Sequence, residues 1–234
     1  MVIEITSDIA DPWCYVGMKR LDNAITAFEE EEEEELKVYL RWHPYINDTS
    51  IQPDGEPYDK YHERRTGSDD WIRRIKLESA DDGVTFRNWG PQNPFTTWIN
   101  SINAHRLLYF VRTRCSWERM DRVVHKLFDQ YYEYGKNISL VDELIWIGKT
   151  MRLSTADDRD VVWHGGIDDV ELEELMRDPS AGRNAVLRED AIAKRMAITG
   201  LPYFEVKGCE PFTGAQSTQS WIVLLEKEFG YRIR

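Results

Sequence analysis

The chain has 234 residues and a formal net charge of −12, with 41% hydrophobic and 12% aromatic residues. This length and composition indicate a globular protein with one substantial core, or with one core interrupted by an inserted subdomain. The negative charge argues against nucleic acid and anionic membranes as partners, because phosphate groups are bound by basic surfaces. No apolar run comes near the roughly 18 residues of a membrane span, so we expect no membrane partner.

Cysteine and histidine usage argues against two further kinds of site. The three cysteines, at positions 14, 115 and 209, lack CxxC spacing and do not form a disulfide framework. The five histidines are scattered, without HxxxH or HxxE pairs, so we expect no metal. The N-terminus reads Met-Val-Ile-Glu, with no basic region or apolar signal segment, which predicts a cytoplasmic protein.

The first 44 residues predict a strand, a helix and a second strand. Residues 2–7 form an apolar run typical of a buried strand. Pro12 suits the first turn of a helix, where its missing N–H is harmless, and Asp11 then occupies the N-cap. The helix runs into seven glutamates, residues 29–35, which we interpret as a solvated, frayed helix end rather than an interaction tail. Residues 36–42 alternate with period two and predict the second strand.

A helical pattern then extends from about residue 57 to 198. Apolar residues recur at spacings of three and four, and glycines and Asp-Pro separate the segments. The predicted helices cover 58–66, 69–79, 98–112, 117–134, 140–151, 171–176 and 183–198. Strands return at 201–206 and 209–213, and a last helix opens at 214–217. The order predicts an α/β sheet domain that is split by a helical insertion.

Four segments of the chain resemble one known family. The matching segments are SDIADPWCYVG (7–17), NSINAHRL (100–107), LFDQYYEYGKNI (127–138), and GLPYF (200–204) with GAQ (214–216). Together, in this order, they resemble the FrnE-like branch of the DsbA family. Its thioredoxin superfamily includes 2-hydroxychromene-2-carboxylate isomerases and kappa-class glutathione transferases. The resemblance covers nearly the whole chain.

The resemblance implies an α/β, thioredoxin-like fold with a large all-helical insertion. We expect the thioredoxin-like domain to be discontinuous, built from residues 1–50 and 185–234, and the insert to span 51–184. In the family, the turn before the first helix carries a CPWC motif. Here Asp11 occupies the place of the first cysteine, and only Cys14 remains. Dithiol exchange needs an attacking thiolate and a second, resolving thiol. Two-cysteine turnover through this motif is therefore excluded.

Cys14 and Asp11 each allow two interpretations. The helix dipole favours a Cys14 thiolate, whereas an ionised Asp11 one turn away disfavours it. We expect a buried, inert thiol, and the alternative is a single reactive one. Asp11 is either a structural N-cap or a catalytic group at the place where related proteins with a serine are thought to hold the glutathione sulfur. An ionised carboxylate there would repel a thiolate, so that route requires a protonated Asp11.

The resemblance also implies substrate-binding residues. Pro202 would follow a cis peptide bond and lie against the turn, leaving the backbone of Leu201 free to pair with an extended substrate; the alternative is an edge-strand proline. Pro12 and Trp13 would contribute contacts at the turn, with Trp13 partly exposed. His105 and Arg106 would line the cleft if the insert covers the turn, and a packed histidine with a structural ion pair is the alternative.

Three functions remain open from the sequence. The first is a DsbA/FrnE-like oxidoreductase-family protein with a degenerate DPWC site and at most monothiol chemistry through Cys14. The second is a glutathione-dependent isomerase or transferase, and the third is a non-catalytic peptide-binding module. We expect no resident cofactor, with glutathione left open as a ligand, and a thiol-containing peptide or small molecule as substrate. The sequence does not indicate an oligomeric state.

Overall fold

A four-stranded mixed sheet forms the centre of the computed structural model, which describes residues 1–32, 36–65, 67–68, 70–157, 159–160 and 162–230. The strands are β1 (Val2–Ser7), β2 (Tyr39–Pro44), β5 (Tyr203–Val206) and β6 (Phe212–Thr213), in the order β2-β1-β5-β6. β2 runs parallel to β1, and β5 is antiparallel to both β1 and β6. The central β1 is therefore paired on both edges, which suits its apolar, buried residues.

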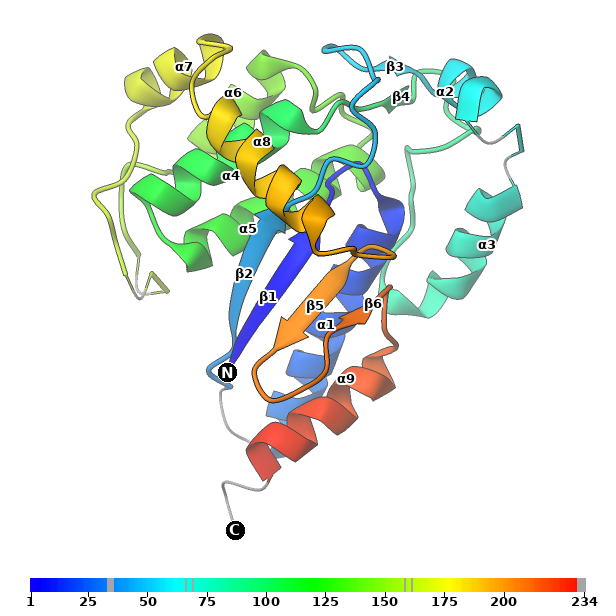
Figure 1. Ribbon diagram of the computed structural model, residues 1–234, viewed down its shortest axis with the longest axis vertical. Coiled ribbons are helices and arrows are strands. Elements are labelled where there is room, and N and C mark those ends of the chain that lie inside the picture. The colour runs from blue at the N-terminus through cyan, green and yellow to red at the C-terminus, as the bar shows by residue number, and fades with distance from the viewer. Residues whose placement is uncertain (33–35, 66, 69, 158, 161, 231–234) are drawn as a thin grey trace.

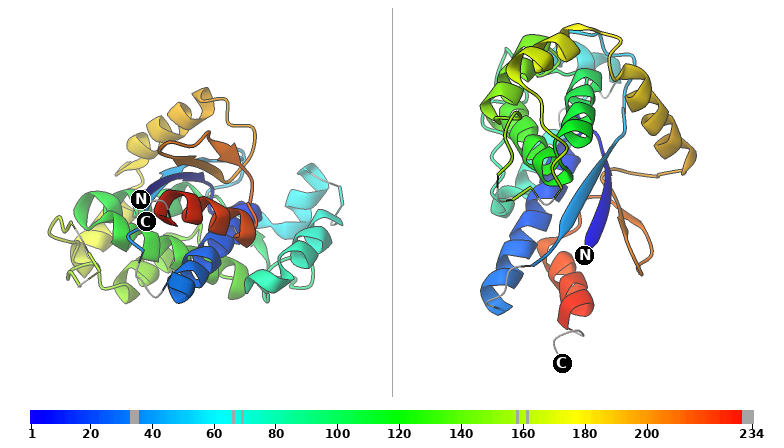
Figure 2. Two further views of the ribbon diagram at one scale, coloured as in Figure 1. Left: turned by 90° about the horizontal axis from the view of Figure 1, so that it is seen from below. Right: turned by 90° about the vertical axis from the view of Figure 1, so that its left-hand side faces the viewer.

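Helices cover both faces of this sheet (Figures 1 and 2). α1 (Pro12–Glu32) and α9 (Thr218–Leu225) pack against each other on one face, and α8 (Arg183–Arg195) lies across the other. Ile3 and Ile5 of β1 and Leu21 of α1 are completely buried. The start of α1 follows directly from the end of β1, so the turn between them lies at one end of the sheet.

The insert packs against the same end of the sheet (Figure 1). Its helices are α2 (Tyr58–Arg65), α3 (Asp70–Glu78), the short 3-10 helix η1 (Ala80–Asp82), α4 (Ile102–Arg114), α5 (Trp117–Phe128), α6 (Val141–Thr150) and α7 (Asp169–Arg177). α5 continues into a π-helical turn, η2 (Asp129–Glu133), and α9 into another, η3 (Glu226–Gly230). One hydrophobic core runs without a break from the sheet into the insert.

The predicted α/β fold with a helical insertion is confirmed, and several boundaries differ from the prediction. β2 begins at Tyr39 rather than Leu36, because the register pairs Tyr39 with Val2 at the start of β1. A two-stranded ribbon joins β3 (Glu56–Pro57) to β4 (Thr97–Trp98). Because Thr97 and Trp98 are engaged in that ribbon, α4 begins at Ile102 rather than at Trp98.

The C-terminal elements also begin later than predicted. β5 begins at Tyr203 rather than Leu201, and β6 is only the two residues Phe212–Thr213. α9 starts at Thr218 because the Ser217 hydroxyl accepts a hydrogen bond from the Ser220 N–H, which is an N-cap.

Three further predictions concern the glutamate run, membrane spans and the division of the chain. α1 ends at Glu32, and the rest of the glutamate run, residues 33–35, lies outside the described residues. Within the part of the chain that the structure describes, no helix has the length and apolarity to cross a membrane. α8 starts at Arg183 and contacts both α4 of the insert and β2 of the sheet. The division into residues 1–50 with 185–234, and 51–184, stays a prediction.

Candidate active site at the start of helix α1

The turn between β1 and α1 is built around an N-cap. The backbone N–H of Asp11 donates to the Asp8 carbonyl over 3.1 Å, and the Cys14 N–H donates to the Asp11 carbonyl over 3.0 Å. The Asp11 carboxylate accepts a 2.8 Å hydrogen bond from the Trp13 N–H. That bond satisfies one of the N–H groups left unpaired at a helix start. The predicted N-cap role of Asp11 is therefore confirmed.

Asp11 differs electrostatically from an ordinary surface carboxylate. The pKa of Asp11 is raised from 3.8 to about 7, mainly by the burial of its partly covered side chain and secondly by the nearby charge of Asp8. Hydrogen bonds from the Trp13 and Cys14 N–H groups oppose the shift. The second carboxylate oxygen lies 3.4 Å from the Asn47 side-chain amide. At neutral pH, both protonation states of Asp11 are therefore well populated, as a general acid–base group requires.

Asp8 stabilises this turn through buried hydrogen bonds, and it was not predicted as a site residue. It is only 1% exposed. One carboxylate oxygen accepts from the Ala10 N–H over 3.0 Å, and the other accepts from the Asn47 N–H over 2.7 Å. Asp8 thereby ties the turn to the loop that follows β2. A carboxylate directly after a buried strand was the only sequence signal for this role.

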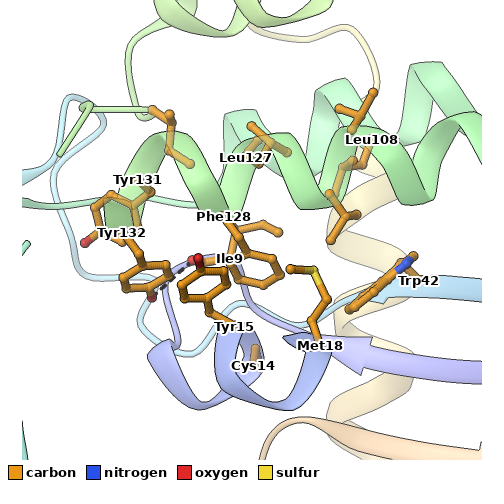
Figure 3. Close-up of a cluster of buried hydrophobic side chains, with 14 of the residues drawn as sticks. Ile9, Cys14, Tyr15, Met18, Trp42, Leu108, Leu127, Phe128, Tyr131 and Tyr132 are labelled. Atoms are coloured by element: carbon orange, nitrogen blue, oxygen red, sulfur yellow. Dashed lines mark hydrogen bonds between the residues drawn. The ribbon is translucent and has the colours of Figure 1, made fainter. Parts of the chain in front are cut away.

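The Cys14 thiol lies behind the turn, inside the core (Figure 3). Its side chain is 0% exposed, and the cluster around it includes Ile9, Tyr15 and Met18. Burial raises the pKa of Cys14 well above its usual value, and the charge of Asp11 acts in the same direction. The prediction of a buried thiol is confirmed.

Pro202 lies directly against the first helix. The Leu201–Pro202 peptide bond is cis, and the Pro202 carbonyl accepts a 2.7 Å hydrogen bond from the Gly214 N–H. A Cβ atom at Gly17 would come within 2.7 Å of Pro202 Cγ, so only glycine permits this close approach. Leu201 is half-buried, and its backbone N–H and C=O form no hydrogen bond with any described residue.

The structure places the other predicted site residues in different surroundings. Trp13 is partly exposed, as predicted, whereas Pro12 is buried. His105 faces the back of the turn, 5% exposed, with its Nε2 3.6 Å from Asp8 Oδ1. Arg106 is 1% exposed and donates to the carbonyls of Ala181, Leu175 and Asp178. Arg106 thus holds the C-terminal end of α7, where helix carbonyls lack internal partners.

Tyr15 links the turn to the insert. Its hydroxyl lies 3.2 Å from both Asp129 Oδ1 and Glu133 Oε1 of η2. Its ring stacks on Tyr132 at 5.2 Å, and the Tyr132 hydroxyl donates to the Ile9 carbonyl over 3.3 Å. Figure 3 shows these rings side by side above α1. The segment 127–138 resembles the family, but its contacts with Tyr15 depend on the fold and have no signal in the sequence.

The side chains around the turn include one partly exposed carboxyl group and no exposed thiol among the described residues. Among the described residues, no group of three or more His, Cys, Asp or Glu side chains is arranged to hold a metal ion. The three cysteines are free, and Cys14 and Cys115 are buried. At the mouth of the turn, the ionisable group is Asp11, beside a half-exposed Trp13 and the edge at Leu201.

A helix that starts at the end of a central strand, with a cis-proline against it, defines a thioredoxin-fold protein. The chain belongs to the DSBA-like thioredoxin domain family, whose pattern matches residues 2–221. No curated protein matches the sequence significantly.

Solved structures with the same fold carry different names. A probable DsbA oxidoreductase from Streptomyces coelicolor has a TM-score of 0.73 at 20% identity, over 98% of this chain and 90% of that one. The cytosolic disulfide reductase DsbM from Pseudomonas aeruginosa has a TM-score of 0.61 at 15% identity, over 99% and 100%. A 2-hydroxychromene-2-carboxylate isomerase has a TM-score of 0.56 at 15% identity, over 100% and 97%. At these identities the similarity establishes the fold.

Proposed function

We propose that this DsbA-family protein has no thiol–disulfide chemistry at its turn and instead uses Asp11 to bind and polarise a substrate. The substrate class is a thiol-containing peptide or small molecule, held between Asp11 and the edge at Leu201 and Pro202. One observation carries the proposal: the Asp11 carboxyl reaches the surface where an attacking sulfur would lie, while the Cys14 thiol is 0% exposed.

The burial of Cys14 argues against even single-thiol chemistry. The nucleophile in thiol exchange is the thiolate, and reactive cysteines have lowered pKa values and access to solvent. Cys14 has neither property, since burial and the charge of Asp11 raise its pKa. Monothiol turnover through Cys14 is therefore the upper limit of any redox function, and we expect none.

Asp11 suits acid–base or hydrogen-bonding chemistry near neutral pH. With a pKa of about 7, its protonated form donates a hydrogen bond to a thiolate or carbonyl oxygen, and its ionised form accepts one from a thiol. The ionised carboxylate would repel a bound thiolate, and this objection does not apply to the protonated form. This pKa supports a second candidate, a glutathione-dependent isomerase or transferase.

The backbone at Leu201 supports a peptide or peptide-like ligand. Its N–H and C=O have no hydrogen-bond partner among the residues that the structure describes. An extended ligand can add main-chain hydrogen bonds to such an edge. Glutathione, a tripeptide, can also pair with such an edge. A non-catalytic peptide-binding module would use the same edge without Asp11.

A cytoplasmic location fits this proposal. All three cysteines are free, and thiols stay reduced in the cytosol. A protein without a working dithiol pair has no need of an oxidising compartment. The location remains part of the proposal, as does the absence of nucleic-acid and membrane partners.

Two assays on the intact protein test the proposal. In insulin reduction with a dithiol donor, the wild type and Cys14→Ser should both stay at background. Turnover by the wild type that is lost in Cys14→Ser would overturn the proposal. Calorimetry with millimolar glutathione should give saturable heat that weakens in Asp11→Ala and is unchanged in Cys14→Ser. Absence of heat would remove glutathione, and the peptide-binding candidate would then be tested by holdase activity in the same variants.

A further inference from the structure

A small cavity lies beside the turn, and Asp11 is not among its lining residues. Its volume is about 10 Å³, and it is bounded by β1, β2, α4 and α5. The lining residues are Ser7, Ile9, Trp42, His43, His105, Leu108, Met120 and Val124. Ile9, Trp42 and Leu108 appear in Figure 3 as part of the core around Cys14. The cavity therefore lies among the elements that pack against the turn, not at the exposed face of the turn.

Two buried polar atoms at this cavity have no hydrogen-bond partner within the described residues. They are Ser7 Oγ and His105 Nε2, on side chains that are 2% and 5% exposed. The 3.6 Å from His105 Nε2 to Asp8 Oδ1 is longer than a hydrogen bond. The Ser7 hydroxyl lies beside the Cys14 thiol and favours its charged form, but it has no partner of hydrogen-bond geometry. Buried polar groups that are left unpaired destabilise the folded state.

The size of the cavity matches one small polar ligand. A cavity of roughly 10–15 Å³ accommodates a single water molecule, provided that two or more polar groups hold it. A purely apolar cavity would stay dry. We propose that this cavity binds one water molecule, which hydrogen-bonds to Ser7 Oγ and His105 Nε2 and joins them into one buried network. A water can donate to one of these atoms and accept from the other, so it satisfies both.

The water would give His105 a role different from the one that the sequence suggested. It connects the end of β1, at Ser7, with α4, at His105, and His105 lies directly beside Asp8. Asp8 in turn holds the Ala10 and Asn47 N–H groups. His105 is thus a positioning residue that supports the turn from behind. This inference does not depend on the reaction at Asp11.

A crystal structure of the intact protein, at a resolution that shows ordered waters, tests the inference directly. We expect one isolated density peak within hydrogen-bond distance of both Ser7 Oγ and His105 Nε2. A structure with ordered waters elsewhere and no peak in this cavity would overturn the inference.

A larger side chain that fills the cavity provides a second test. It should lower the midpoint of thermal unfolding if the cavity holds a water, and raise the midpoint if the cavity is dry. Val124 lines the cavity and is fully buried, so Val124→Ile should expel the water and lower the midpoint of thermal unfolding. Val123 is equally buried and does not line the cavity, so Val123→Ile measures the effect of overpacking alone. In a Ser7→Ala background, where the water has already lost one partner, Val124→Ile should lower the midpoint less. A raised midpoint in the wild-type background would indicate a dry cavity and overturn the inference.

Discussion

The turn at the start of α1 has two sides, which differ in solvent exposure. We call the side that carries Asp11 the front, and the side that carries Cys14, Asp8 and His105 the back. At the front, Asp11 is partly exposed, and its pKa of about 7 lets it exchange a proton at neutral pH. At the back, Cys14, Asp8 and His105 are all at least nine-tenths buried. Under the proposed function, burial rather than the presence of a sulfur atom in the motif decides which group can react.

Under the proposed function, this contrast explains how the family fold can persist without the dithiol reaction. The sheet, the proline against Gly17 and the insert above the turn are all in place. In the proposed function, the residue that alters the chemistry is Asp11, which also serves as a good N-cap. The fold is therefore kept by contacts that do not involve the attacking group.

The largest expected effect comes from Asp11→Cys, which would restore a thiol to the front of the turn. Residues three apart at a helix start are close enough for a disulfide, so the introduced sulfur and Cys14 can pair. We expect insulin reduction to rise from background to measurable turnover. Asp11→Ser, which restores no sulfur, serves as the control and should stay at background. No gain in Asp11→Cys would contradict the view that only the attacking sulfur is missing.

Gly17→Ala should disturb the contact between the first helix and the proline. The new Cβ would lie 2.7 Å from Pro202 Cγ, and a proline ring cannot move aside easily. We expect a loss of about 2–3 kcal/mol in the free energy of unfolding, measured by chemical denaturation. Gly200→Ala is the matched control, because its Cβ would meet Thr213 only at 3.7 Å. Equal stability of both variants would show that the close approach is not needed.

Asp11→Asn tests the raised pKa of Asp11. The variant should be more stable than the wild type at high pH and equally stable at low pH. With its pKa raised from 3.8 to about 7, the folded state binds more protons than the unfolded state between about pH 4 and 7. The free energy of unfolding therefore falls as the pH rises through this window. Asparagine caps a helix as well as aspartate does and does not titrate.

The variant should match the wild type near pH 4 and be more stable by about 2 kcal/mol at pH 8. A full three-unit shift corresponds to about 4 kcal/mol, and partial exposure of Asp11 reduces it. Denaturation curves at both pH values measure the difference. A variant less stable than the wild type at pH 8 would show that the folded state favours the ionised Asp11 carboxylate, and would contradict the raised pKa.

The smallest expected effect tests the link between the turn and the insert. Tyr15→Phe removes the hydroxyl that lies between Asp129 and Glu133, and it should lower the free energy of unfolding by about 1 kcal/mol. Tyr109 also belongs to the insert interface, and its hydroxyl has no hydrogen bond among the described residues. Tyr109→Phe should therefore change stability little, and an equal loss in both would remove the proposed link.

Local signals in the sequence were sufficient for the fold and for part of the site. The apolar run in residues 2–7, Pro12 in the first turn and Asp11 at the N-cap all act within a few residues. Cys14, in the first turn of the helix, is buried as expected. Such features depend on neighbours along the chain, and they were predicted correctly.

Features that depend on distant partners could not be predicted. The ribbon at Thr97–Trp98 needs residues 56–57 opposite it, and the Arg106 guanidinium meets carbonyls at 175 and 178. The raised pKa of Asp11 comes from burial beneath parts of the chain that only the fold assembles. The role of Asp8 could not be predicted from the sequence beyond its position after a strand, because one of its hydrogen-bond partners is the distant backbone N–H of Asn47.

Thiol labelling of the native protein tests the central claim, that the back of the turn is closed, most directly. Cys209 is partly exposed, whereas Cys14 and Cys115 are buried. A thiol reagent should therefore label Cys209 in the folded wild type, and Cys14 only after unfolding, as mass spectrometry of the digested protein would show. Labelling of Cys14 in the folded protein as fast as that of Cys209 would contradict the account.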